Sequence, residues 1–401
     1  MKAILVMTSD NQFYIDELTS LCLACMIEVK DIVIQKIDTV HIATYIGKGK
    51  VYEIKNMITD EIVIFDNELS PLQVRNLTDI LNTEVTDRSD LILRIFEKRA
   101  KTKEAKLQVE IARNQYLLPR LAGMQEHLSH QQGGSGFRGR GEKQIELDRR
   151  IIARKLSKAR KELAQIVKQR QIQRQRRKNN DVPVIALVGY TNSGKSTLMN
   201  VFCKENHKKV FQKDMLFATL ETATRQIKIK NHTCLLTDTV GFIERLPHHL
   251  IQAFRSTLEE VKEADVLLHI IDTSFEDYMM QIQTTNEVLK SLGVENTPMI
   301  YVYNKIDLNQ YAFIQPQSPY VFISAKNQIG LDLLEDEISH LLFKEYEIFE
   351  FSIPYEKGEI YKNINQHCLV IDTQYLEDSI YLKVEAKNQE VQQYLSYILK
   401  N

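Results

Sequence analysis

The segment VIALVGYTNSGKSTLMN, residues 184–200, joins an apolar run to a glycine-containing loop and then to a second apolar stretch. Between Gly189 and Ser196 the loop fits the pattern G-x-x-x-x-G-K-[ST]. A strand, a loop of this kind and a helix in that order predict a P-loop, whose backbone N–H groups and helix N-terminus face the phosphates of a nucleotide. We expect Lys195 to reach the β- and γ-phosphates and the Ser196 hydroxyl to bind Mg²⁺.

A second apolar run ends in an acid within LLTDTVGFIERLP, residues 235–247. Asp238 is expected to hold the magnesium ion through water, and the Gly241 amide to reach the γ-phosphate. Phe242 stands where many small GTPases carry the glutamine that orients the attacking water, and a phenyl ring cannot position water. The metal shell also needs a threonine from the segment between the P-loop and Asp238, where position alone leaves three open: Thr219, Thr222 and Thr224.

The segment MIYVYNKIDL, residues 299–308, predicts the base. The Asp307 carboxylate can accept hydrogen bonds from N1–H and the 2-amino group of guanine, whereas adenine would leave it unpaired at a penalty on the order of several kcal/mol. Asn304 is expected to tie this loop to the P-loop, and the Lys305 stem to cover the base. In FISAK, residues 322–326, Ser324 and the Ala325 amide complete a guanine site, so the predicted ligand is GTP or GDP.

Length and composition predict several domains and no membrane span. The chain has 401 residues, 43% of them hydrophobic, and no charge-free apolar run approaches the length of a bilayer. Asp10 interrupts the N-terminus before a signal-type apolar core can form, so we expect a cytoplasmic protein. Five cysteines do not suggest a disulfide framework, and the pair Cys22 and Cys25 is interpreted as two thiols on an apolar helix face.

The N-terminal part, residues 1–95, is predicted to be a small α/β domain. The segments KAILVMT, KDIVIQKI and EIVIFD are typical of buried strands, and SPLQVRNLTDIL is typical of a helix capped by Ser70 with Pro71 at its first position. Strands that alternate with helices favour a parallel sheet. The glycines of GKGK are interpreted as a turn before a helix.

Residues 96–180 predict a long helical hairpin with a glycine-rich tip. Apolar residues recur at helical spacing from Glu97 to His130, and the glycine-rich segment HQQGGSGFRGRGEKQIELD follows. From Arg149 to Lys178 thirteen Lys and Arg stand against one acid, Glu162, which indicates a surface for a polyanion. A flexible connector is the alternative for the tip. The residues predicted to contact RNA are Phe137, Arg138, Arg140, Arg149 and Arg150.

The rest of the chain predicts two further domains. In residues 181–344, predicted strands and helices alternate, which is typical of a P-loop domain with a doubly wound, mostly parallel sheet. Residues 345–401 show short predicted strands and a closing helix, which is typical of a small α+β domain. From Glu345 onward acids outnumber bases about twofold and arginine is absent, so this last domain is not a candidate for polyanion binding.

The motifs taken together resemble those of the bacterial HflX GTPases. The likeness rests on IGKGKVYEI, DNELSPLQVRNL, VTDRSDLILRIFEKRAKTKEAKLQVEIA, YLLPRL, GGSGFRGRGEKQIELDRR, GYTNSGKSTLMN, LFATLE, DTVGFIERLPHHLIQAFRSTLEE and NKIDL, and covers about the first 345 residues. The resemblance implies a factor that binds the large ribosomal subunit and separates stalled 70S ribosomes under stress. It also implies that Thr219 is the switch threonine and that a hydrophobic residue replaces the glutamine, so that switch rearrangement on the ribosome positions the water.

The resulting site predictions form three sets. The expected nucleotide contacts are Gly189, Tyr190, Thr191, Asn192, Ser193, Gly194, Lys195, Ser196, Thr197, Phe217, Ala218, Thr219, Leu220, Glu221, Asp238, Thr239, Val240, Gly241, Asn304, Lys305, Ile306, Asp307, Ser324, Ala325 and Lys326. The expected metal ligands are Ser196, Thr219 and Asp238, and the catalytic residues are Lys195, Thr219 and Gly241. We expect a monomer. The alternative function is a GTP-dependent signalling switch that recruits a protein or membrane-complex partner through the basic helix.

Overall fold

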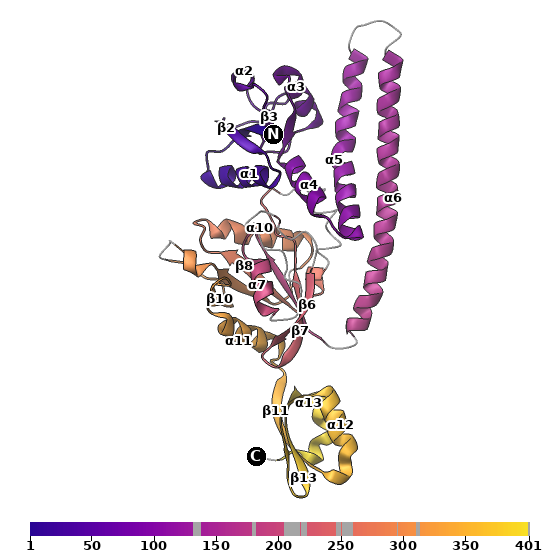
Figure 1. Ribbon diagram of the computed structural model, residues 1–401, viewed down its shortest axis with the longest axis vertical. Helices are drawn as coiled ribbons and strands as arrows, with labels where there is room; N and C mark the ends of the chain where they lie inside the picture. Colours follow the sequence, from indigo (N-terminus) through magenta and orange to yellow (C-terminus); the bar gives the residue numbers. More distant parts are fainter. Residues whose placement is uncertain are drawn as a thin grey trace.

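The computed structural model describes residues 1–130, 138–178, 182–203, 217, 223–245, 250, 260–294, 296–309 and 313–399, with side chains left out at 122–130, 138–145 and 171–178. Three sheets follow one another along the long axis, and two long helices lie beside the upper two (Figure 1). The predicted fold class is confirmed, while the boundaries at residues 95, 180 and 344 stay predictions. Within the described residues no helix is both long enough and apolar enough to cross a membrane.

The N-terminal sheet is parallel and has the order β2-β1-β3-β4. Its strands are β1 (Lys2–Met7), β2 (Glu28–Ile34), β3 (Ile62–Phe65) and β4 (Val85–Asp87), and its helices are α1 (Gln12–Ala24), α2 (Lys48–Met57), α3 (Pro71–Leu81) and α4 (Arg88–Arg99). Ser70 caps α3 in a capping box with Gln73, and Pro71 opens the helix, as the sequence predicts. Both thiols of Cys22 and Cys25 are buried in the core.

One strand prediction was partly wrong. The segment around β2 was expected to be buried, yet Val33 is its one fully buried residue, and Ile32 and Ile34 are 41% and 37% exposed. β2 lies at one edge of the sheet, and it is exposed there although β4 at the other edge is buried; a continuous apolar run in the sequence does not tell such positions apart.

The helical hairpin consists of α5 (Lys103–His130) and α6 (Arg138–Lys178), which pack along each other. The helical spacing that begins at Glu97 spans two helices: Glu97 belongs to α4, and a break follows in which the Thr102 hydroxyl accepts a hydrogen bond from the Ala105 amide at 3.2 Å. The second helix begins earlier than expected, at Arg138 within the glycine-rich segment. α6 is therefore longer than the glycines suggest, although each glycine disfavours a helix by about 1 kcal/mol.

The central sheet has the order β10-β9-β8-β5-β7-β6 and is parallel except for β6. Its strands are β5 (Val184–Gly189), β6 (Ala223–Ile229), β7 (His232–Asp238), β8 (Val266–Asp272), β9 (Met299–Asn304) and β10 (Tyr320–Phe322). The helices described around it are α7 (Lys195–Phe202), α10 (Tyr278–Ser291), η1 (Ile306–Leu308) and α11 (Leu331–Leu342). All strands but β6 point the same way, so the loops that follow them meet at one edge.

The C-terminal domain is an antiparallel sheet covered by short helices. Its strands, in the order β11-β13-β12, are β11 (Tyr346–Pro354), β12 (Leu369–Tyr375) and β13 (Ser379–Lys387). The helices are η2 (Tyr355–Lys357), α12 (Gly358–His367), α13 (Asn388–Val391) and η3 (Gln392–Tyr397). In Figure 1 the domain hangs below the central sheet on the strand β11.

A buried ion cluster joins the N-terminal domain to the central one. Arg88, which is 2% exposed, pairs with Glu17 and with Asp66, the latter at 3.0 Å, and donates to the Glu244 carbonyl at 3.1 Å. The Tyr190 hydroxyl donates to Glu17 at 2.5 Å and accepts from the Glu244 amide at 2.9 Å. Burial raises the pKa of the Glu17 carboxyl, although the Arg88 charge acts against that shift.

Replacing the buried cation is expected to destabilise the fold strongly. Arg88→Met leaves Glu17 and Asp66 buried without their shared partner, and we expect a loss of about 3–5 kcal/mol in the free energy of unfolding, measured by urea titration. The matched control is Arg150→Met, which breaks the exposed pair with Glu146 and should cost less than about 1 kcal/mol. Equal losses for the two variants contradict a structural role for the cluster.

Candidate nucleotide site

The loop between β5 and α7 has the backbone that a phosphate cradle needs. Gly189 has φ +140° and Gly194 has φ +99°, backbone angles that residues with a side chain rarely adopt. A Cβ at Gly189 would collide with the Ile270 carbonyl, and one at Gly194 with the Asn304 amide. The N-terminus of α7 therefore opens directly onto the loop, with Lys195 as its first residue.

Lys195 is held inside this loop. Its Nζ donates to the Gly189 carbonyl at 3.0 Å and to the Tyr190 carbonyl at 2.6 Å. Complete burial lowers the pKa of Lys195 to about 8, while Asp238 favours its charged form. A phosphate beside this ammonium would likewise stabilise the charge.

The predicted metal ligands come together as far as the structure describes them. The Ser196 hydroxyl donates to Oδ2 of Asp238 at 2.6 Å, so the two oxygens converge at the ends of α7 and β7. Oxygen donors of this kind suit Mg²⁺. Thr219 lies outside the described residues, as do Ala218, Leu220, Glu221 and Thr222. Thr224 lies in β6, where its hydroxyl is 3.1 Å from that of Thr237.

Asn304 connects three loops of the site. Its Nδ2 donates to the Ser193 carbonyl at 2.8 Å, and its Oδ1 accepts from the Ala325 amide at 2.9 Å. The amide and hydroxyl of Thr273 donate to the Asn304 carbonyl at 3.0 and 2.8 Å. One buried side chain thus fixes the P-loop relative to both base-side loops.

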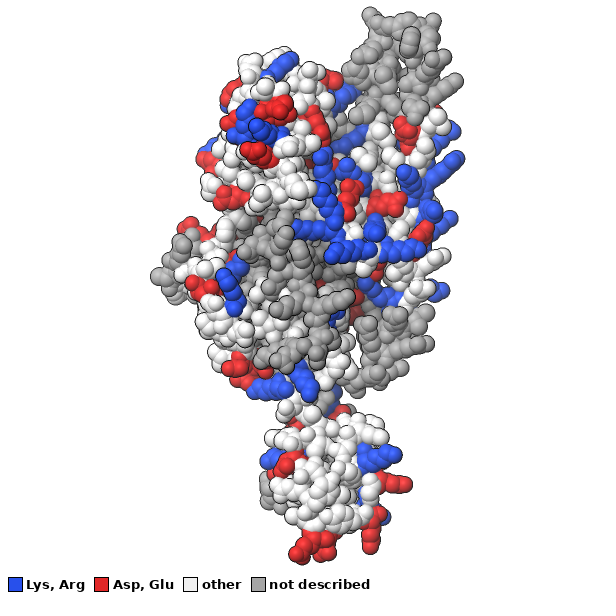
Figure 2. Space-filling view, viewed as in Figure 1, with Lys and Arg blue, Asp and Glu red and all other residues white. Residues whose placement is uncertain are grey.

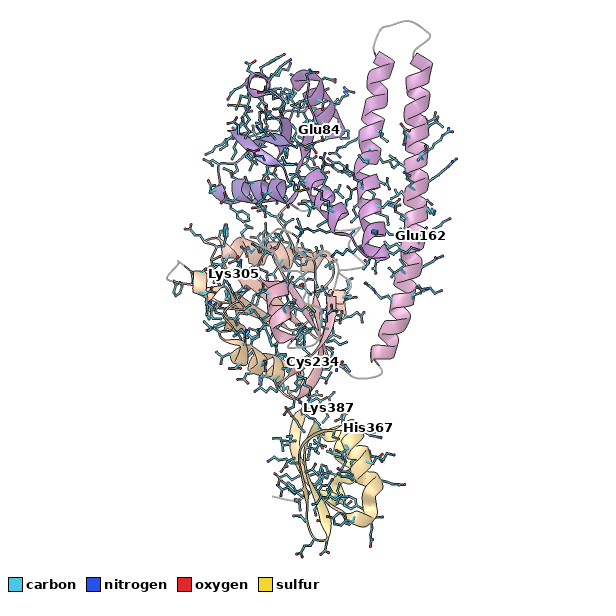
Figure 3. The ribbon with its side chains drawn as sticks, viewed as in Figure 1. Glu84, Glu162, Cys234, Lys305, His367 and Lys387 are labelled. Carbon is cyan, nitrogen blue, oxygen red and sulfur yellow. The ribbon has the colours of Figure 1, made fainter. Side chains whose placement is uncertain are left out.

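The residues predicted to contact the guanine base follow β9 and β10. Lys305 has φ +65°, and its Nζ lies 2.6 Å from Oδ2 of Asp272. Asp307 is exposed on η1 and Lys326 is exposed after β10, whereas the buried Ser324 accepts from the Asn327 amide at 3.1 Å. In Figure 3 Lys305 lies at the end of the central domain nearer to the N-terminal domain.

The segment after Asp238 lies against the P-loop. A Cβ at Gly241 would come within 2.7 Å of the Thr191 Cα and 3.1 Å of the Lys195 Nζ. The Phe242 amide donates to the Gly189 carbonyl at 3.1 Å, and its carbonyl accepts from the Thr191 amide at 2.6 Å. The Phe242 side chain is 2% exposed and belongs to the core, so it does not face a phosphate site.

Several other predicted nucleotide contacts lie in or beside the segments of the site. Thr239 donates its hydroxyl to the Leu187 carbonyl at 2.6 Å, and the Phe217 amide donates to the Thr191 hydroxyl at 2.9 Å. Asn192 is exposed with φ +62°. Also adjacent in the same segments are Thr197, Val240 and Ile306.

The predicted RNA contacts lie elsewhere. Phe137 falls outside the described residues, and Arg138 and Arg140 belong to α6 without described side chains. Arg149 and Arg150 are exposed on the same helix, which contributes no residue to the nucleotide segments.

Sequence reasoning missed three partners of the site. Asp272 and Thr273 stabilise the loop after β9, and the signal for them was an acid at the end of the apolar run VLLHIID. Glu17, which binds the P-loop Tyr190 from 173 residues away in the chain, gave no local signal.

Comparison with known proteins identifies relatives along most of the chain. The family described as GTP-binding GTPase N-terminal matches residues 12–97, the GTP-binding GTPase middle region matches 99–177, and the family described as 50S ribosome-binding GTPase matches 184–305. GTPase HflX of Caldanaerobacter subterraneus subsp. tengcongensis is 43% identical over 95% of this chain and 89% of the relative. GTPase HflX of Lacrimispora saccharolytica is 40% identical over 93% and 89%.

Among solved structures, a GTP-binding protein from the archaeon Sulfolobus solfataricus in complex with GDP is similar to this chain. It is 27% identical with a TM-score of 0.45 over 86% of this chain and 99% of that one. The P-loop domain and the HflX relatives together show that the chain is a GTP hydrolase.

Changing the predicted base ligand should change base selectivity. Asp307→Asn turns a double acceptor into a mixed donor and acceptor, so we expect GTP affinity to fall about 100-fold and preference to shift toward xanthosine triphosphate. Binding of both nucleotides is measured by fluorescence titration. Asp332→Asn, at an exposed acid of α11, is the control and should change neither affinity. Full GTP affinity in Asp307→Asn without a gain for xanthosine triphosphate would remove Asp307 from the site.

Proposed function

This chain belongs to the HflX family of GTPases, and we propose that it binds the large ribosomal subunit in the cytoplasm and separates or rescues stalled 70S ribosomes under stress. The observation that carries the proposal is the charged face of α6. The description of the matched family as a ribosome-binding GTPase supports the same partner. In this proposal the GTP state determines when the factor leaves the ribosome.

The basic face of α6 is a row of exposed cations. Its members are Arg149, Arg150, Arg154, Lys155, Lys158, Arg160, Lys161 and Lys168. Figure 2 shows blue side chains along the outer edge of the molecule over this helix, while red predominates at the tip of the C-terminal domain. A row of cations on a helix that stands away from the nucleotide site suits the phosphate backbone of ribosomal RNA.

The apolar side of α6 argues against a lipid surface. Leu156 and Ala159 are buried, and Leu163 and Ile166 pack against the same core. Leu147 and Ile151 are the large apolar side chains exposed on the described part of the helix, too few for the broad apolar stripe of a membrane-lying helix. The helix therefore uses its apolar residues to hold α5 and offers mainly charge to a partner.

The nucleotide chemistry follows from the contacts of the loop. Ser196 and Asp238 would hold a magnesium ion, which neutralises charge on the β- and γ-phosphates when bound. Lys195 adds a second positive charge, and Gly241 lies beside it. Phe242 gives no group that orients water, and its backbone is paired with the P-loop, so positioning of the attacking water requires a change in this segment.

The large subunit is expected to supply that change. At saturating GTP, addition of purified large subunits should raise the turnover of the unmodified protein at least about tenfold, which corresponds to about 1.4 kcal/mol of barrier. Phe242→Gln should stay slow when free, because a glutamine at this buried position still lacks a placed backbone. Phosphate release is measured with and without subunits. A free Phe242→Gln enzyme as fast as the stimulated protein would show that the missing glutamine limits hydrolysis.

Charge removal on the basic face should weaken subunit binding and leave the nucleotide site intact. The triple change Arg154→Gln, Arg160→Gln and Lys161→Gln is expected to reduce binding and to flatten its salt dependence by about 0.7–0.9 in slope per lost phosphate contact. Co-sedimentation with subunits is measured across a salt series with GDP and a GTP analogue.

The control for charge removal lies on the C-terminal domain. Lys357→Gln and Lys362→Gln remove two exposed cations of that domain and should leave the salt slope unchanged. If the triple change in α6 leaves both subunit binding and its salt slope intact, the proposal that this helix binds RNA is wrong. Loss of all co-sedimentation in every nucleotide state, for the unmodified protein as well, would favour the signalling-switch alternative.

A further inference from the structure

We propose that the C-terminal domain senses the nucleotide state through the β6–β7 hairpin, residues 223–238. This hairpin reaches the nucleotide site at one end and touches the C-terminal domain at the other. The inference concerns nucleotide binding alone and does not depend on the ribosomal partner proposed above.

The first end of the hairpin belongs to the nucleotide site. Ala223, the first residue of β6, pairs with Asp238, the last residue of β7, and Asp238 accepts the hydrogen bond from Ser196 at 2.6 Å. In the next residue pair of the two strands, the hydroxyls of Thr224 and Thr237 lie 3.1 Å apart. Any movement of Asp238 on binding of a metal and a third phosphate is therefore transmitted to both strands of the hairpin.

The hairpin is weakly restrained by the rest of the sheet. β6 is the edge strand, and β7 pairs with β5 over four residues, from Leu235 to Asp238. The projecting end, residues 227–234, extends beyond that pairing, and its two strands pair with each other. The projecting end can therefore shift while β7 stays paired with β5, within the limits set by Ile227, Ile229 and Cys234, which are buried in the core of the central domain.

The projecting end meets the C-terminal domain at His232. Its ring stacks on Phe343, the residue after α11, with centroids 3.9 Å apart, and meets the Tyr346 ring edge-on at 5.2 Å. Nε2 lies 3.1 Å from Oε2 of Glu385 in β13, an ion-pair distance when the ring is protonated, without the alignment of a hydrogen bond. The His232 side chain thus contacts both the neck between the central and C-terminal domains, residues 343–346, and Glu385 of the C-terminal sheet.

A second ion pair holds the same turn to the central domain. Lys230, which has φ +51°, pairs with Asp336 of α11. On the other side of the neck, the Lys387 ammonium lies 5.4 Å from the centroid of the Tyr346 ring. In Figure 3 Lys387 and Cys234 lie close to the neck, at the opposite end of the central domain from Lys305.

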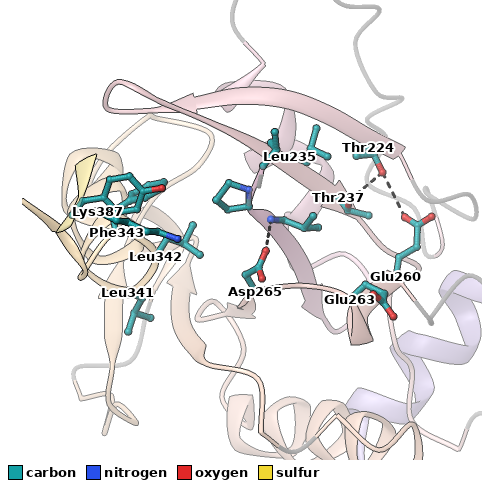
Figure 4. Close-up of a pocket in the computed structure, with 14 residues that line it drawn as sticks. Thr224, Leu235, Thr237, Glu260, Glu263, Asp265, Leu341, Leu342, Phe343 and Lys387 are labelled. Carbon is teal, nitrogen blue, oxygen red and sulfur yellow. Dashed lines mark hydrogen bonds between the residues drawn. The ribbon is translucent and has the colours of Figure 1, made fainter. Parts of the chain in front are cut away.

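A cavity beside the hairpin gives it room to move. Its volume is about 540 Å³ (Figure 4). Its walls come from the hairpin, the start of β5, three acids of the segment 260–265, the end of α11, the neck and β13. Thr224, Leu235 and Thr237 face it from the hairpin, and Phe343, Tyr346 and Lys387 face it from the neck and β13. Close-packed interiors resist displacement, so open space at this junction is where two arrangements of hairpin and neck can exist.

The coupling is tested by hydrogen–deuterium exchange of the full chain with GDP and with a non-hydrolysable GTP analogue. We expect exchange in residues 343–354 and 379–387 to differ at least about threefold between the two nucleotides. His232→Ala and Glu385→Gln should remove this difference while both variants still bind each nucleotide. Glu350→Gln is the matched control, because Glu350 lies in the same sheet and pairs with Lys383 at 3.1 Å; it should keep the difference.

Reciprocity supplies a second measurement. If the bound nucleotide changes the stability of the His232 contact by some factor, the contact must change the ratio of the affinities for the GTP analogue and GDP by that same factor. We therefore expect this ratio to shift in His232→Ala and Glu385→Gln and to stay constant in Glu350→Gln. Equal exchange with both nucleotides in the unmodified protein, a difference that survives in both variants, or an unchanged affinity ratio would overturn the proposal.

Discussion

The Arg88 guanidinium is the constraint on which the domain arrangement depends. It is fully enclosed, and a charge in that position is tolerable because Glu17, Asp66 and the Glu244 carbonyl surround it. Those partners come from α1, from the end of β3 and from the segment after β7. The ion pairs lie within the N-terminal domain, and the Glu244 carbonyl, the Tyr190 hydroxyl and Arg245 join the cluster from the central domain. Another docking of the two domains would leave these buried polar contacts unmade.

The same cluster connects the docking to the nucleotide site. Tyr190 belongs to the P-loop, and Glu244 and Arg245 follow Phe242, so both sides of the phosphate site share one anchor in the N-terminal domain. Tyr14 adds a hydrogen bond to Glu244 at 3.2 Å, and the Arg245 guanidinium lies over its ring. The N-terminal domain therefore holds both sides of the candidate phosphate site in place, although every phosphate-binding motif lies in the central domain.

Local patterns were sufficient for the fold class and for the strand ends that carry the site. The P-loop, Asp238 and Asn304 lie where apolar runs end. Such positions can be predicted because a short stretch of sequence shows where a buried strand ends. The position of β2 at a sheet edge, the pairing of Glu17 with Tyr190 and the contact of His232 with Glu385 were not predictable. Each depends on which distant segments pack together, and periodicity within one segment carries no information on that.

The long helix α6 has a mechanical consequence. Its 41 residues, at about 1.5 Å per residue, span about 60 Å, and β5 and the P-loop are the next described elements along the chain. Because α6 packs along α5, the two helices form one rigid unit, and a rotation of about 10° at the end beside the central domain displaces the far end of α6 by about 10 Å. Motions too small to disturb the packing around a nucleotide can thus become displacements on the scale of an RNA groove.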